Sequence, residues 1–162
     1  FIGIAVVSQL PHINGLSLSW DNVAFGTKGL GYIYNQHQSL KTYPKGPFVL
    51  SVYITLDKAV DEFERRRLFE MSEEKMTEIV IEELKTMHPE IEKDILEISF
   101  QKWGHGMVTP YPGALAKHHA FVELSQNAKR THLAHTDFAS YSVFEEGFDA
   151  GRNAALKVVH HV

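Results

Sequence analysis

The chain has 162 residues, of which 44% are hydrophobic and 22% charged, as is usual for a globular domain. Its net charge of −4, without a basic stripe, gives no electrostatic case for binding nucleic acid. The lack of cysteine excludes a disulfide framework, a thiolate nucleophile and a thiolate metal site. No apolar run is long enough to predict a membrane span, and the compartment stays open between bacterial periplasm and cytoplasm.

The first part of the chain predicts strands. Residues 1–7 are apolar and indicate a buried strand, which is an unusual start for a native protein and suggests a fragment or a processed piece. Residues 22–35 carry glycines beside aromatic residues, a pattern that predicts two short strands joined by a glycine-rich bend. Residues 48–56 alternate and are rich in β-branched and aromatic side chains, so they predict a further strand.

Two helices are predicted next, the first over residues 58–69. The second begins after Ser72, a suitable N-cap that is followed by two acids in the first turn. Helical spacing gives it one apolar face, made of Met76, Ile79, Val80, Leu84 and Met87. His88 precedes a proline and should end the helix.

The second half predicts strands over residues 95–103 and 119–124, a strand stub that ends at Ala134, and a final helix over residues 144–159. One side of the first of these strands would consist of Leu96, Ile98 and Phe100. This order of elements predicts an α+β fold with a mixed or antiparallel sheet, because strands come first, two helices lie between strands, and a helix ends the chain.

The last thirty residues hold the most informative pattern. A strand stub leads into the polar turn His135-Thr136-Asp137, and a loop then leads into a helix that opens with acids. The Thr136 hydroxyl can donate, the Asp137 carboxylate can accept, and a helix N-terminus offers free N–H groups to an anionic ligand. The residues alone leave this interpretation open beside a plain strand–loop–helix with a local Asx-turn.

This segment resembles the C-terminal flavin-binding segment of the flavin-dependent amine oxidases, which close with a similar turn, a loop and a helix carrying Gly and Ala. The resemblance implies FAD as the cofactor. The residues that it assigns to the flavin are Ala134, His135, Thr136, Asp137, Val143, Phe144 and Glu145. Two positions depart from the family pattern, because His135 replaces the turn glycine and Glu146 stands where a helix glycine is expected.

A second motif is the stretch from Lys102 to Met107, in which glycines flank His105 and allow a sharp turn after the strand. The simple alternative is a core Trp103 and a loop histidine. The stretch resembles one in spermidine dehydrogenase-like members of the same family, where it lies near the flavin and the substrate tunnel. Trp103 and His105 are therefore expected on the substrate side.

A third motif combines residues 20–23, 29–33 and 37–38, and it resembles the same relatives. The resemblance implies that this glycine-rich strand, with Tyr32 and His37, lines the substrate cavity; the alternative is an ordinary hairpin. Its Gly-Leu-Gly is no dinucleotide fingerprint, since the third glycine is missing.

Ten histidines raise the alternative of a metal-dependent hydrolase, since three imidazoles could bind zinc. The tightest groups are His118-His119 and the pair His132 and His135. Neighbouring histidines in a strand point to opposite faces, so no metal site is predicted.

The three motifs follow in order and cover most of the chain, which thus resembles the C-terminal portion of a flavin amine oxidase of the spermidine dehydrogenase-like branch. Residues 1–125 would belong to the substrate domain and residues 126–162 to the FAD-binding domain. The activity implied is oxidation of a C–N bond in a small amine or polyamine, with hydride transfer to the flavin.

Relatives hold FAD with an N-terminal βαβ unit that carries Gly-x-Gly-x-x-Gly, and no such sequence occurs here. We therefore expect the chain to be inactive alone and to need an N-terminal FAD-binding half, in the same or a companion chain. Self-association through an exposed apolar surface is also expected. The rival interpretation is a non-enzymatic accessory or binding module with an amine-oxidase-like fold.

Overall fold

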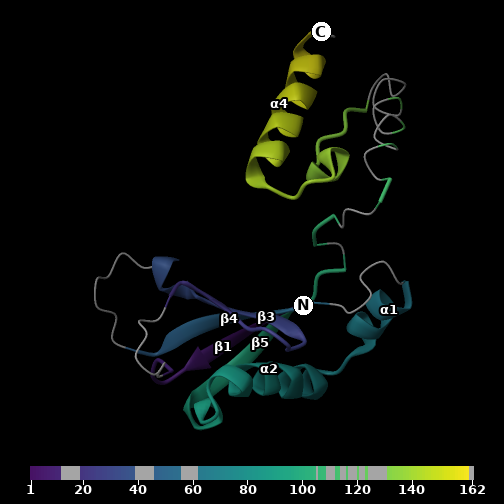
Figure 1. Cartoon of the computed structure of the whole chain (residues 1–162). Helices are drawn as coiled ribbons and strands as arrows, with labels where there is room; N and C mark the ends of the chain where they lie inside the picture. Colours follow the sequence, from purple (N-terminus) through teal and green to yellow (C-terminus); the bar gives the residue numbers. More distant parts are fainter. Residues whose placement is uncertain are drawn as a thin grey trace. The chain divides into compact units, whose positions relative to one another are not determined.

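The computed structural model describes residues 1–11, 19–38, 46–55, 62–104, 106–108, 112–113, 116, 120, 123 and 131–160 (Figure 1). The chain divides into two compact units, Phe1–Gly104 and His105–Val162, and each is described by itself. None of the described helices is long and apolar enough to cross a membrane.

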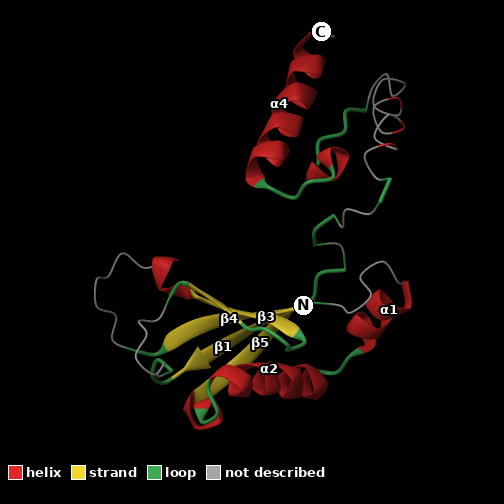
Figure 2. Cartoon of the chain, in the orientation of Figure 1, coloured by secondary structure: helices red, strands yellow, loops and turns green. Residues whose placement is uncertain are grey.

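The first unit is built on a five-stranded sheet, drawn in yellow in Figure 2. Its strands are β1 (Ile2–Val7), β2 (Asp21–Val23), β3 (Gly29–Tyr34), β4 (Phe48–Ile54) and β5 (Ile95–Gln101). Their order is β2-β3-β4-β1-β5, and every neighbouring pair is antiparallel. The α+β prediction is confirmed, with the antiparallel form of the sheet.

The helices of the first unit are α1 (Glu62–Glu70) and α2 (Glu73–Met87), and α2 runs along one face of the sheet (Figures 1 and 2). The Ser72 hydroxyl caps α2 by accepting from the Lys75 amide at 3.3 Å, as predicted. At the other end the His88 amide donates to the Leu84 carbonyl at 2.8 Å, and the helix stops before Pro89.

The core lies between α2 and the sheet. The apolar face of α2 is confirmed: Met76, Val80 and Leu84 are buried, and Ile79 and Met87 pack against them. A fully buried Val or Leu side chain contributes about 1.5–3 kcal/mol to folding. Gly3 on β1 allows the close approach of the helix, because a Cβ atom there would lie 2.4 Å from Cγ2 of Val80.

One predicted side-chain direction is wrong. Leu96 was expected on the inner side of its strand with Ile98 and Phe100, but it is 61% exposed. Along the ladder, Val6 pairs with Glu97 and Val7 pairs with Ile95, so Leu96 is an extra residue in β5. This bulge shifts the alternation by one residue, and Ile95 packs against the core in its place.

The second unit contains a short 3-10 turn, η4 (Thr136–Ala139), and the helix α4 (Phe144–His160), which confirms the predicted final helix. Residues 131–135 form no strand, so the predicted strand stub ending at Ala134 is wrong. In the predicted strand over residues 119–124, the structure describes only Ala120 and Glu123, and both are helical.

Candidate functional site

The turn before α4 is held by a histidine. Nδ1 of His135 accepts from the Asp137 amide at 3.2 Å and lies 3.1 Å from Oδ1 of Asp137. A neutral Nδ1 accepts from the amide, whereas a protonated Nδ1 would donate to the carboxylate. Both side chains are exposed. The His135 side chain thus accepts from the amide two residues later, as the side chain of an Asx-turn does. The Asp137 amide is therefore not free to bind a ligand.

The chain then turns sharply into α4. Ser140 ends η4 with left-handed backbone angles (φ 53°, ψ 29°), and its amide donates to the Asp137 carbonyl at 3.1 Å. The first hydrogen bond of the α4 ladder runs from the Gly147 amide to the Val143 carbonyl at 3.3 Å. The amides of residues 144–146 come before it, so they lack an intrahelical acceptor and remain available to a ligand.

Thr136 and the start of α4 lie against each other. A Cβ atom built on Gly147 would stand 3.3 Å from Cγ2 of Thr136, a contact tighter than side chains usually make. Gly147 therefore lets the first turn of the helix approach the polar turn. The polar turn and the first turn of α4, which the resemblance assigns to the flavin, therefore lie close together.

The charges at the start of α4 limit which kind of ligand can bind there. Glu145 is exposed and Glu146 half-buried, and both lie in the first turn of α4. Acids there favour the helix dipole but repel a second anion. The donors therefore suit an uncharged acceptor, such as a ring carbonyl, better than a phosphate. Phe144 is 80% exposed, and its ring stacks on Phe148 with centroids 6.2 Å apart.

The substrate-side stretch lies at the end of β5 in the first unit. Lys102 Nζ donates to the carbonyls of Phe69 at 3.0 Å and Met71 at 2.8 Å, which ties the strand end to the end of α1. The Phe69 ring covers Gly104, where an added Cβ atom would lie 2.7 Å from it. Trp103 is 54% exposed at this fixed strand end. His105 lies outside the described residues.

Tyr32 lies in the core. It is 1% exposed, and its hydroxyl is 2.8 Å from Nε2 of His88 at the end of α2. Burial raises the pKa of Tyr32 to about 12. Its side chain thus packs under the sheet, as in an ordinary hairpin. His37 lies in the short turn η1 (Asn35–Gln38).

The sequence analysis missed a buried carboxylate. Glu83 of α2 is 3% exposed and accepts from the Thr27 hydroxyl at 2.7 Å and from the Gly29 amide at 3.0 Å. The sequence signal was an acid between the buried Val80 and Leu84 on the apolar face of α2. Glu83 fastens the β2–β3 hairpin to the helix.

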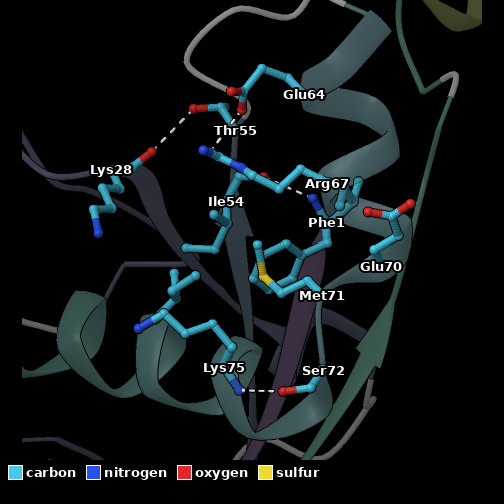
Figure 3. A pocket seen from close by; sticks show the side chains of 12 residues that line it. Phe1, Lys28, Ile54, Thr55, Glu64, Arg67, Glu70, Met71, Ser72 and Lys75 are labelled. Atoms are coloured by element: carbon cyan, nitrogen blue, oxygen red, sulfur yellow. Dashed lines mark hydrogen bonds and ion pairs between the residues drawn. The ribbon is translucent and has the colours of Figure 1, made fainter.

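A pocket of about 620 Å³ was also missed, and it lies in the first unit among the end of β4, α1 and the start of α2 (Figure 3). Its walls come from segments far apart in the sequence, which explains why no local pattern predicted it. Elsewhere, no cluster of three or more metal-ligating side chains occurs in the part of the chain that the structure describes.

The chain matches the family of flavin containing amine oxidoreductases over residues 11–159. Because this match covers most of the chain, the protein belongs to that family. The family contains flavin, and FAD is its usual cofactor, so the resemblance found in the sequence is confirmed at this level. No curated protein and no solved structure matches the chain.

Proposed function

We propose that the chain is the C-terminal portion of an FAD-dependent oxidoreductase of the spermidine dehydrogenase-like branch, which oxidises a C–N bond of an amine or polyamine. The observation that carries this proposal is the close approach of Thr136 to Gly147, which brings the polar turn to the start of α4, where the amides of residues 144–146 lack an intrahelical acceptor. The family match supports the same assignment.

The residues present fit a flavin in their chemistry. The Thr136 hydroxyl and the amides of Phe144 and Glu145 would donate to it, and the acids of this turn favour an uncharged ring acceptor over phosphate. When bound, FAD supplies the two-electron acceptor for the oxidation of the amine. The Asp137 carboxylate lies in the same turn, where it can accept from a ligand hydroxyl.

On the substrate side, the proposal assigns Trp103 to the amine. Its exposed ring offers an aromatic face, to which a cationic amine is attracted. The two hydrogen bonds of Lys102 and the contact of Gly104 with Phe69 hold this strand end in place. Trp103 would orient the amine, and His105 follows it in the sequence as a second candidate.

The proposal includes a partner, since the chain carries no Gly-x-Gly-x-x-Gly sequence to hold the FAD pyrophosphate. An N-terminal FAD-binding half, in the same or a companion polypeptide, would complete the site. The chain alone would then bind FAD weakly and be inactive.

The test is FAD retention on a desalting column, followed by flavin absorbance, for the chain alone and together with the polypeptide that carries the FAD-binding half. We expect retention only in the second case. Gly147→Val should then weaken retention about tenfold or more, because the added side chain separates α4 from Thr136. Gly151→Val is the matched control, since no atom lies within 4 Å of a Cβ atom at that position.

Two outcomes would contradict the proposal. If neither preparation retains FAD, the non-enzymatic binding module becomes the better interpretation. If both glycine variants lose FAD equally, the loss reflects the stability of α4 rather than its contact with Thr136.

A further inference from the structure

The pocket of the first unit has an apolar floor. Ile54 at the end of β4 and Leu68 of α1 are buried, and Met71 and Ile79 are half-buried beside them. Its volume of about 620 Å³ is within the range of small-molecule sites. Figure 3 shows these walls coming from β4, α1 and α2. A floor of this kind suits an aliphatic or aromatic tail.

Charged side chains surround the floor. Three are cationic, Lys28, Arg67 and Lys75, and two are carboxylates, Glu64 and Glu70. Glu64 is already paired, because its Oε2 lies 2.8 Å from Nη2 of Arg67. Two of the three cations are thus paired, Arg67 with Glu64 and Lys75 with Glu78, which leaves Lys28 and Glu70 as the lining charges without an ion pair among the described residues.

Lys28 is the cation best placed for a ligand. It forms no ion pair within the described parts of the chain, whereas Nζ of Lys75 lies 2.6 Å from Oε2 of Glu78. The next residue, Gly29, pairs with the floor residue Ile54 across the β3–β4 ladder. The backbone of Lys28 thus lies beside the apolar floor, and Lys28 is one of the residues that line the pocket.

The backbone of Lys28 is fixed on both sides. Its carbonyl accepts from the Thr55 hydroxyl at 3.2 Å, and the Gly29 amide that follows donates to Glu83. The Thr27 hydroxyl that precedes it also donates to Glu83. The fixed backbone sets where the Lys28 side chain begins, and from there its flexible stem allows the ammonium to reach an anion bound next to the floor.

We infer that this pocket binds a small amphipathic carboxylate, with its apolar tail on the floor formed by Ile54, Leu68, Met71 and Ile79 and its carboxylate on Lys28. Arg67 retains N–H donors beyond its bond to Glu64 and can support the same group. An amine would have to pair with Glu70 at the end of α1, whereas Lys28 directly precedes Gly29, the ladder partner of the floor residue Ile54, so the position of Lys28 favours a carboxylate on this floor. This site is separate from the proposed flavin site and needs no cofactor.

The experiment compares three probes with the same eight-carbon tail, octanoate, octan-1-ol and octylamine, by titration into the full chain without flavin. The methyl NMR signals of Ile54, Met71 and Ile79 report on the floor. We expect octanoate to bind about tenfold more tightly than octan-1-ol, with octylamine the weakest. Lys28→Gln should bring the affinity for octanoate down to that of octan-1-ol.

Lys85→Gln is the control, because Lys85 is an exposed lysine of α2 that pairs with Glu92 and does not line this pocket. It should leave octanoate binding unchanged, and circular dichroism should show that both variants are folded. Equal binding of the three probes, tightest binding of octylamine, or the absence of methyl shifts would each overturn the inference.

Discussion

The carboxylate of Glu83 and the amide of Gly29 lie 3.0 Å apart in the interior of the first unit, and this hydrogen bond joins α2 to the β2–β3 hairpin. The same carboxylate accepts from the Thr27 hydroxyl at 2.7 Å. A buried carboxylate is costly unless its oxygens are satisfied, and here two donors of one hairpin turn satisfy them. The hairpin is thus held by a helix residue that lies more than fifty positions later in the chain.

Removal of this carboxylate should destabilise the fold. Glu83→Ala leaves the buried Gly29 amide without its acceptor and leaves the Thr27 hydroxyl only the Gly29 carbonyl at 3.2 Å, so we expect a loss of about 2–4 kcal/mol in the free energy of unfolding. Urea denaturation measures it. The neighbouring Glu82 is exposed, and Glu82→Ala should cost well under about 1 kcal/mol. Equal losses in the two variants would show that the buried hydrogen bonds do not stabilise the hairpin.

Two glycines of the same hairpin should respond differently to alanine. Both have positive φ, 78° at Gly26 and 100° at Gly31, so each substitution costs about 1–2 kcal/mol in backbone strain. At Gly31 the new Cβ atom would also lie 1.9 Å from the Asn22 carbonyl oxygen, while at Gly26 it meets nothing within 4 Å. Gly31→Ala should therefore lower the thermal midpoint much more than Gly26→Ala, and similar shifts would contradict the close contact.

Alkaline pH should destabilise the protein through Tyr32. Burial raises its pKa in the folded state to about 12, while the unfolded chain ionises near 10. The stabilisation is fully present below about pH 10 and is lost as the pH rises towards 12, because only the unfolded state releases the proton in this window. The loss should reach about 2–3 kcal/mol.

The difference between wild type and Tyr32→Phe isolates this effect, since the variant cannot ionise at that position. Urea denaturation between pH 9 and about pH 11 should show a smaller slope for the variant. Tyr141→Phe, at a position that is 61% exposed, should keep the wild-type slope. The idea fails if the slope for Tyr32→Phe equals that of the wild type.

The N-cap of α2 gives a smaller effect. Ser72→Ala removes the acceptor of the Lys75 amide, so we expect a loss of about 1 kcal/mol in the free energy of unfolding. Ser99→Ala, on the exposed part of β5, should change it by less than about 0.5 kcal/mol. Chemical denaturation of the two variants side by side decides whether the cap contributes.

Local sequence patterns predicted the strands and helices of the first unit, since alternation, helical spacing and the Ser72 cap are properties of neighbouring residues. These patterns failed where pairing with a distant part of the chain decides the conformation or the direction of a side chain. Leu96 faces outward because of the register between β5 and β1. The predicted strand stub at Ala134 has the right composition, but no described strand pairs with it.

The sequence could indicate which segment holds the candidate flavin site, because the turn around Thr136 and the start of α4 are close in the sequence. The sequence could not predict how closely these two parts pack, since their packing depends on the approach of Thr136 to Gly147. For Tyr32, the pattern of an aromatic residue beside glycines does not say which side of the strand faces the helix, and the strand places its hydroxyl next to His88. The role of Tyr32 towards a substrate stays a prediction.

The extra residue in β5 has a further consequence. β5 forms one border of the sheet, and no described strand lies on its outer side. A regular border strand offers a straight row of amides and carbonyls to which another polypeptide can add. The irregularity at Leu96 twists this row near its start, which hinders the growth of the sheet into an aggregate. The residue that interrupts the ladder between β5 and β1 thereby makes the outer side of β5 a poorer template for a further strand.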